Sequence, residues 1–383
     1  MLPVAWPQRI PWGLLLSAVG LLALGWVGIA RSEELGDGDG HYVRQQVIWS
    51  VAACCVTWLA TMVGYRWLTH YAYAAFLAIL FLLVAVFFFP EIHGTHRWLR
   101  LGRVGLQPSE FAKPVFVLAL ARYLMSGENY RTLRGLLIPL TLTLVPVILV
   151  LREPDLGTSL VFIPVLFAML YAAGARKTDL VVLTVCGIVM LPLLWTQMSG
   201  EQKSRVTALF DQSGPDRAPS DDGYHLHQSK QLLSLGGIRG SMIAGEAVAD
   251  RAVYQLPEDH TDFVFIVLAE RLGWCGVLAV LVLEFGVVIS AMGIAQATRE
   301  PFGRLTAMGL ATLVGVQAVI NTAMTVGILP VTGLSLPLVS YGGSGLIAHS
   351  LALGLLVNIA LRPGFEVTAT PFRFVARRPV RQV

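Results

Sequence analysis

Four clusters of polar and charged residues lie beside long apolar runs of this chain. In or near a membrane an ionisable side chain is costly, so such clusters are where function is to be sought. The cluster LPEDHTDF (256–263) has four titratable groups within five positions and leads into an apolar run that begins just after Asp262. The simplest interpretation of Asp262 is a helix N-cap. We favour a general base, because burial and neighbouring like charges raise a carboxylate's pKa towards a useful range.

The cluster QPSEFAK (107–113) has the features of a helix start. Pro108 suits the first turn, and Glu110 suits the positive end of the helix dipole. Glu110 and Lys113 are three residues apart and share one helix face. Two interpretations stay open: a cap with an internal ion pair, or a Lys113 ammonium that faces an anionic substrate.

The cluster REPDLGT (152–158) predicts a tight turn between two helices. Its proline and glycine account for the turn, but the two carboxylates, Glu153 and Asp155, are more than a turn needs. A structural role and the binding of a cation or of an acceptor group are the alternatives.

The last cluster is a proline- and glycine-broken segment, LPVTGLSLPLVSYGGS (329–344). Broken backbone at membrane depth is tolerated where it lines a cavity. The backbone N–H groups and side-chain hydroxyls of this segment either bind a diphosphate or form hydrogen bonds with one another. The candidate binding residues here are Ser340, Gly342, Gly343 and Ser344.

The composition indicates an integral membrane protein. Of 383 residues, 55% are hydrophobic and only 14% are charged, whereas soluble domains average about 25% charged. Apolar runs that fit membrane-spanning helices lie near residues 10–30, 47–64, 70–90, 108–125, 135–151, 157–174, 179–197, 263–294, 305–329 and 340–361. We therefore predict an all-α polytopic bundle of about ten transmembrane helices, forming a single domain over residues 1–383.

The distribution of arginine and lysine predicts the topology. With both termini in the cytoplasm, most of the basic loops and the basic tail (363–383) lie on the cytoplasmic side, and the tail meets anionic lipid headgroups. The long polar stretch 198–262 is then extracytoplasmic, and a structureless loop of that length would be a lid or a substrate site. Nucleic-acid binding is not expected, because membrane topology accounts for the net charge of +4.

The clusters, in this order, resemble the family of shape, elongation, division and sporulation (SEDS) proteins, to which RodA and FtsW belong. The resemblance covers nearly the whole chain. It is carried by Arg44-Gln45, Arg97-Trp98, QPSEFAK, EPDLGTS, Gln228-Ser229-Lys230, Gly236-Gly237, PEDHTDF, Asn321 and LPVTGLSLPLVSYGGSG. Two departures from the family pattern are Glu153, where glutamine is usual, and Gly345, where serine is more usual.

The resemblance implies a peptidoglycan glycosyltransferase that polymerises lipid II on the outer face of the bacterial cytoplasmic membrane. Asp262 matches the family's catalytic aspartate, and Glu110 and Lys113 match charged positions that line its outer cavity. Glu110, Glu153 and Asp155 are then the candidate ligands of a divalent cation, Mg or Mn, and no organic cofactor is expected. The remaining candidate substrate-binding residues are Arg44, Arg97, Gln228, Lys230 and His260.

Three further expectations complete the sequence analysis. The implied partner is a class B penicillin-binding protein that supplies the transpeptidase. The short N-terminal segment favours cell elongation and rod shape over division. The alternative from another class is a flippase for the lipid-linked precursor, which would need the cations but no base, so only a polymerase should depend on Asp262.

Overall fold

The computed structural model describes residues 10–35, 40–90, 96–101, 104–126, 134–210, 222–244 and 260–362. Each of the ten apolar runs forms a helix, which confirms the predicted all-α bundle. These helices are α1 (Trp12–Leu35), α2 (His41–Met62), α3 (Tyr65–Ala85), α4 (Pro108–Leu124), α5 (Leu137–Arg152), α6 (Leu156–Ala173), α7 (Lys177–Gln197), α11 (Val264–Ala297), α12 (Pro301–Thr325) and α13 (Gly343–Leu361).

Eight segments of the described chain are long and apolar enough to cross a membrane. The other two bundle helices are shorter, because α4 has 17 residues and α5 has 16. A helix rises about 1.5 Å per residue, so α4 and α5 extend over most of the hydrocarbon thickness. Both pack among the longer helices, and α4 is almost completely buried between α3, α6, α12 and α13.

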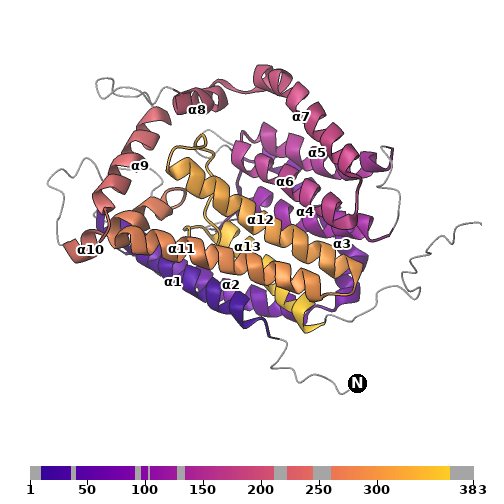
Figure 1. Ribbon diagram of the computed structural model, residues 1–383, viewed down its shortest axis with the longest axis horizontal. Coiled ribbons are helices and arrows are strands. Elements are labelled where there is room, and N and C mark those ends of the chain that lie inside the picture. The colour runs from indigo at the N-terminus through magenta and orange to yellow at the C-terminus, as the bar shows by residue number, and fades with distance from the viewer. Residues whose placement is uncertain are drawn as a thin grey trace, which may run out of the picture.

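The long polar segment contains helices within the residues that the structure describes. It contains α8 (Gly200–Phe210), α9 (Asp222–Gly236) and α10 (Ser241–Ala244). Figure 1 shows α7, α8 and α9 forming an arch beside the bundle. The apolar content of this segment is too low to signal helices, but α9 packs against α11 and thereby gains tertiary support.

Four small elements complete the described structure. The strands β1 (Leu99–Leu101) and β2 (Val104–Leu106) pair antiparallel between α3 and α4, with Leu99 opposite Leu106. Single 3₁₀ turns, η2 (Val86–Phe88) and η4 (Arg134–Leu136), follow α3 and precede α5. Strands this short are not predictable from the sequence, because three residues are too few to show an alternating pattern.

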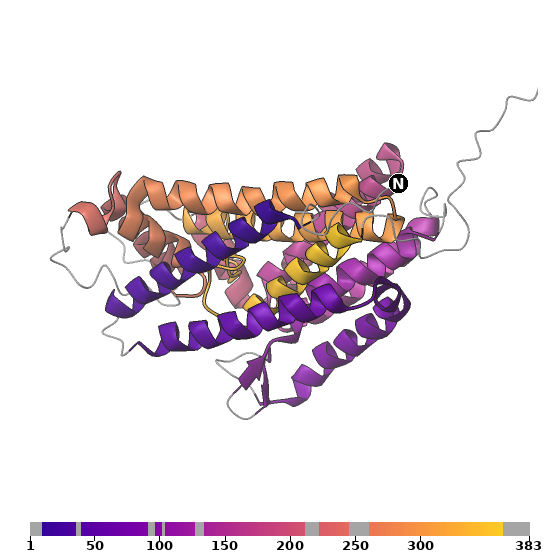
Figure 2. The same cartoon turned by 90° about the horizontal axis from the view of Figure 1, so that it is seen from below.

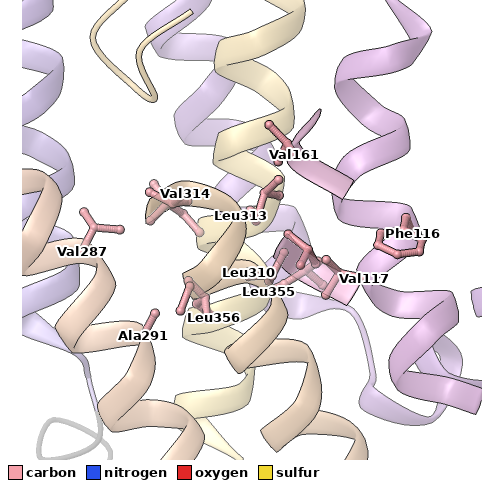
Figure 3. Packing of buried hydrophobic residues seen from close by; sticks show 14 of the residues in the cluster. Phe116, Val117, Val161, Val287, Ala291, Leu310, Leu313, Val314, Leu355 and Leu356 are labelled. Carbon is pink, nitrogen blue, oxygen red and sulfur yellow. The ribbon is translucent and has the colours of Figure 1, made fainter. Parts of the chain in front are cut away.

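The apolar core lies where α11, α12 and α13 meet α4 and α6. Figure 3 shows branched side chains of these helices filling the space between them, including Val287, Leu310 and Leu355. Close packing of this kind holds the helices in fixed relative positions. The polar ends of the helices are therefore placed on a rigid frame.

The four chemistry-bearing clusters meet at one end of the bundle. Figure 2 shows the helices running back and forth along the length of the molecule. As a result, the ends of α5 and α12 lie at the same end as the starts of α4, α6, α11 and α13. The contacts between the clusters confirm this: an added Cβ at Gly157 would lie only 2.6 Å from the carbonyl oxygen of Thr332.

Candidate active site

Asp262 lies in the turn before α11, next to the broken segment 329–344. The side-chain amide of Asn321, on α12, donates to the backbone carbonyls of Asp262 (2.9 Å) and Leu334 (2.6 Å). This single buried amide joins the turn to the broken segment. The N-cap position of α11 is Phe263, whose side chain makes no cap hydrogen bond. Asp262 therefore lies one residue before the cap position, and its role stays a prediction.

The carboxylate of Asp262 is half-buried and faces Gly333. A Cβ added to Gly333 would lie 3.5 Å from Asp262 Oδ2. Gly333 has a φ of +73°, in the left-handed region that glycine favours. A side chain at this position would be strained and would occupy the space in front of the carboxylate.

A second set of contacts holds His260 and Ser340 beside this turn. Tyr341 donates its backbone N–H to the His260 carbonyl (2.9 Å), and the Ser340 hydroxyl donates to the Thr261 carbonyl. The Ser340 hydroxyl also accepts from the backbone N–H of Leu336 (2.7 Å). The His260 ring stacks on Tyr42, with 4.3 Å between ring centroids. Ser340 and His260 thus fix the loops around Asp262, and their contact with substrate stays a prediction.

Glu110 and Lys113 form the predicted ion pair on α4. Lys113 Nζ lies 2.8 Å from Glu110 Oε1 and donates to Gln317 Oε1 (2.9 Å), and the lysine is only 2% exposed. Gln317 in turn donates to the Ser335 carbonyl (2.9 Å) in the broken segment. The pair and its partner therefore support the loop that faces Asp262. Direct substrate binding by Glu110 or Lys113 stays a prediction.

Residues at the start of α13 tie this segment to α4. Ser344 Oγ accepts from the backbone N–H of Gln107 (3.0 Å) and donates to the Gly105 carbonyl (3.2 Å). A Cβ at Gly343 would lie 2.5 Å from the Trp49 ring, whereas one at Gly342 would meet nothing within 4 Å. The backbone at Gly342 therefore borders open space at a helix N-terminus, where an anion is favoured.

The cluster 152–158 places two carboxylates and one guanidinium together. Asp155 caps α6, accepting from the Thr158 backbone N–H (3.0 Å), and lies 3.4 Å from Gln107 Nε2. Arg97 donates to the backbone carbonyls of Glu153 (2.7 Å) and Pro154. Glu153 is fully buried, and neither of its carboxylate oxygens has a hydrogen-bond partner. Burial, followed by the neighbouring Asp155 charge, raises the pKa of Glu153 to about 9.

The remaining predicted substrate-binding residues come from α2 and α9. Arg44 Nε donates to the Gly40 carbonyl at the start of α2 (3.1 Å). Gln228 is buried on α9, and Lys230 passes over Gly327, where an added Cβ would lie 2.6 Å from Lys230 Cε. Both α9 residues therefore lie at the end of the bundle that contains Asp262.

The three candidate metal ligands do not form one ligand set. Within the described ranges, no group of three or more His, Cys, Asp or Glu side chains is close enough to hold a metal ion. Glu110 is paired with Lys113, whereas Glu153 and Asp155 lie together at the α5–α6 turn. The acidic residues Glu258 and Asp259 fall outside the described part of the chain, as does the basic tail 363–383.

Sequence reasoning missed three polar side chains near the site: Arg205 on α8, Gln317 on α12 and His349 on α13. Gln317 and His349 are buried polar residues inside apolar runs, and this is a signal that could have identified them. Arg205 gives no such signal, because it lies among many charged residues in the long polar segment.

The fold and the site define a class: a polytopic membrane protein with carboxylates, cations and the broken segment 329–344 at one end of its helix bundle. The family of cell cycle proteins that comprises FtsW, RodA and SpoVE matches residues 9–363. The chain belongs to this family, the SEDS proteins.

Relatives within the family specify its activity. The chain is 40% identical over 282 residues to the peptidoglycan glycosyltransferase MrdB of Escherichia coli K12, covering 73% of this chain and 74% of that protein. It is 32% identical over 361 residues to a probable peptidoglycan glycosyltransferase FtsW of Trichlorobacter lovleyi, covering 91% and 92%. Like these relatives, the chain is a peptidoglycan glycosyltransferase.

Solved structures support the same assignment. A chain of a peptidoglycan synthase complex, described as coordinating polymerisation and crosslinking, matches with a TM-score of 0.79 and 31% identity, covering 92% of this chain and 98% of that one. The rod shape determining protein RodA of Thermus thermophilus matches with a TM-score of 0.68 and 28% identity, covering 92% and 97%.

Proposed function

We propose that this glycosyltransferase polymerises lipid II into glycan strands at the outer face of the cytoplasmic membrane, in cell elongation. The observation that carries the proposal is the placement of Asp262. Its backbone is fixed by Asn321, and its half-buried carboxylate faces the space left by Gly333. A flippase has no need of a carboxylate held in this way.

Asp262 acts as the general base in this proposal. It accepts the proton of the acceptor's 4-hydroxyl while that oxygen forms a bond to the donor's anomeric carbon. The bond from that carbon to the diphosphate oxygen breaks, and the lipid diphosphate leaves with the electron pair. A base positioned within hydrogen-bond reach contributes about 10²- to 10⁴-fold to such a step.

The cations proposed to stabilise the leaving diphosphate are Lys113, Arg44, Arg97 and Lys230. The described contacts support them unequally. Lys113 is closed in by Glu110 and Gln317, and Arg97 is engaged with two backbone carbonyls. Arg44 and Lys230 lie on helices that border the same end of the bundle.

A divalent cation is proposed at the pair Glu153 and Asp155. Two adjacent buried carboxylates are a chemically suitable donor set for Mg or Mn. When bound, such an ion would supply positive charge for the diphosphate. Glu110 is less suited, because its carboxylate is paired with Lys113.

Two further parts of the proposal concern the assembly. A class B penicillin-binding protein is the proposed partner, and the resemblance to a chain of a synthase complex that couples polymerisation to crosslinking supports it. Both termini are proposed to be cytoplasmic. The arginine-rich tail and the pairing of ten helices into five hairpins support this orientation.

The proposal is tested by incubating lipid II with purified protein and separating the products on a gel. Each reaction is run alone, with the cognate penicillin-binding protein, and with EDTA or added Mg or Mn. Wild type should form polymer, and Asp262→Asn should lose at least about 100-fold in rate, because the amide cannot accept the proton as a carboxylate does. EDTA should stop the reaction and added metal should restore it.

Two results would contradict this function. Polymer made by Asp262→Asn at the wild-type rate would exclude Asp262 as the base. A wild-type protein that forms no polymer, even with its partner and a divalent ion, but moves lipid II across vesicle membranes, would establish the flippase.

A further inference from the structure

Three aromatic rings from distant parts of the chain meet beside the turn that holds Asp262. They are Tyr42 at the start of α2, His260 in the turn itself, and Tyr341 in the broken segment 329–344. We propose that the outer face of the Tyr42 ring binds a sugar ring of the acceptor by stacking. This inference rests on the proposed function and assigns a saccharide subsite within it.

The ring distances show which face of Tyr42 is available. Tyr42 and His260 are stacked, with centroids 4.3 Å apart and planes inclined by 26°. Tyr341 lies 5.1 Å from Tyr42 and 5.3 Å from His260. If Tyr341 covered the outer face of Tyr42, it would lie about twice as far from His260 as from Tyr42. It therefore flanks the stack, and Tyr42, which is 38% exposed, turns its outer face to the surroundings.

The Tyr42 ring is held on a fixed backbone. The buried carboxylate of Glu33, near the end of α1, accepts from the backbone N–H groups of Tyr42 (2.6 Å) and Val43 (3.1 Å). Negative charge at a helix N-terminus is favourable, so this contact fixes the first turn of α2. A ring that is already in place loses little conformational entropy when a ligand binds to it.

The other two rings are tied to α2 and to each other. The Tyr341 hydroxyl donates to Gln45 Oε1, and the Tyr341 backbone N–H donates to the His260 carbonyl (2.9 Å). These bonds join α2, the broken segment and the turn before α11. The three rings therefore form one preorganised platform.

The residues around Tyr42 indicate a polar ligand and not lipid. His41 and Arg44, on the same first turn of α2, are exposed and polar. Further along α2 the exposed side chains are apolar, such as Val47 and Ile48, as contact with lipid requires. An aromatic face with a polar border suits a pyranose ring, which presents C–H groups on its faces and hydroxyls at its rim. The C–H groups, like the positive edge of an aromatic ring, are attracted to the negative face of the tyrosine.

The platform lies close enough to the proposed base to act on the same substrate. His260 precedes Asp262 by two residues, and two residues span at most about 7 Å of chain. This separation is comparable to the length of a sugar residue. An acceptor whose 4-hydroxyl lies at Asp262 can therefore reach the Tyr42 ring with the same disaccharide unit.

The experiment compares Tyr42→Leu and Tyr42→Trp with Tyr71→Leu. Leucine keeps an apolar side chain against His260 but has no aromatic face. Tyr71 on α3 is the matched control, because it is also exposed and stacked on a ring, that of Trp67 (5.0 Å, 15°), but near the opposite end of the bundle. The kcat and KM for lipid II are measured on full-length protein in detergent. The Kd for the soluble disaccharide N-acetylglucosaminyl-N-acetylmuramic acid is measured by saturation-transfer NMR.

Tyr42→Leu should raise both the disaccharide Kd and the KM for lipid II about fivefold, as expected for the loss of one aromatic stacking contact. The kcat should change little, because stacking is equally strong in the ground state and the transition state. Tyr42→Trp should stay close to wild type, since it keeps the aromatic face, and Tyr71→Leu should match wild type. If Tyr42→Leu does not fold, Tyr42→Met replaces it.

Other outcomes overturn the inference. An unchanged disaccharide Kd in Tyr42→Leu does so, and if the kcat falls at the same time, Tyr42 acts only by packing against His260. An equal rise of the Kd in Tyr71→Leu would show that the effect is not specific to the platform. If wild type makes no polymer, the proposed function fails, and the disaccharide Kd still reports separately on Tyr42.

Discussion

Glu110 and Glu153 are both buried at the end of the bundle that contains Asp262, yet their surroundings are opposite. Glu110 is 5% exposed and its Oε1 lies 2.8 Å from the Lys113 ammonium. Glu153 is fully buried, and neither of its carboxylate oxygens has a partner. A buried acid is stable either beside a cation or as the neutral, protonated form. Glu110 is stabilised in the first way, beside the Lys113 ammonium, and Glu153 in the second, as the protonated form.

The local structure explains the difference. Glu110 and Lys113 are three residues apart in the first turns of α4, where side chains on one face meet. Glu153 occupies the C-cap of α5, at the negative end of a helix, and Asp155 lies two residues further on. The nearby Arg97 is directed to backbone carbonyls, so Glu153 gains little from its charge.

The largest effect is expected from removing the cation of the first pair. Lys113→Met keeps most of the side-chain volume but leaves Glu110 as a buried charge without its partner. Breaking a buried pair in this way costs about 3 to 5 kcal/mol. The unfolding midpoint of the purified protein in detergent should fall sharply.

The matched control is the double variant Glu110→Gln with Lys113→Met, which removes both charges. It should recover most of the lost stability, because replacing both partners leaves no buried charge. A single Lys113→Met variant as stable as wild type would mean that Glu110 does not depend on Lys113.

A smaller effect, of opposite sign, is expected at the second glutamate. Because the pKa of folded Glu153 is raised to about 9, the stability that it contributes is complete below about pH 4.5 and is lost as the pH rises towards about 9. Each pH unit in this window is equivalent to about 1.4 kcal/mol. In metal-free protein, Glu153→Gln, which cannot ionise, should therefore be more stable than wild type by about 3 kcal/mol at pH 7.

Unfolding midpoints of both proteins from pH 5 to pH 9 provide the measurement. The advantage of Glu153→Gln should grow with pH. An advantage that is absent at pH 8 would indicate that Glu153 has a charge partner, such as a divalent cation. Repeating the scan in EDTA separates these cases.

The same contrast shows how far the sequence predicts the structure. The ten helices follow from their apolar runs, because a backbone in hydrocarbon must satisfy its own hydrogen bonds. The Glu110–Lys113 pair follows from residue spacing on one helix. The missing partner of Glu153 does not, because it depends on where Arg97 points across a turn from a distant part of the chain.

Two other features were beyond sequence reasoning for the same reason. α11 is kinked at Gly273, which has a φ of +62°, and Trp274 there donates its backbone N–H to the Ile238 carbonyl (3.3 Å). The place of Arg205 beside Asp262 depends on how α8 and α9 dock. Both arise from contacts between segments far apart in the sequence, which no local pattern specifies.

The smallest effect concerns the one oxygen of Glu110 that Lys113 does not satisfy. Glu110 Oε2 is buried without a hydrogen-bond partner, and a Cβ added to Gly345 would lie 3.5 Å from it, an ordinary van der Waals distance. Gly345→Ser would place a hydroxyl beside this oxygen. A hydrogen bond to a charged group contributes about 1.5 to 3 kcal/mol to stability. The entropy lost when the hydroxyl is fixed in place offsets part of this gain. We expect a net gain of about 1 kcal/mol, read as a higher unfolding midpoint.

Gly345→Ala is the control that separates the contribution of the serine hydroxyl from the stabilisation that any residue other than glycine gives to the helix backbone. In a helix, alanine is more stable than glycine by about 0.5 to 1 kcal/mol, and Gly345→Ser should exceed it only if the new hydroxyl bonds to Glu110. In the Lys113→Met background the advantage of serine over alanine should increase, because Glu110 has then lost its other partner. Equal unfolding midpoints for Gly345→Ser and Gly345→Ala in both backgrounds would show that Glu110 gains no hydrogen bond from the new hydroxyl. The Lys113 ammonium would then be the only donor that this buried glutamate needs.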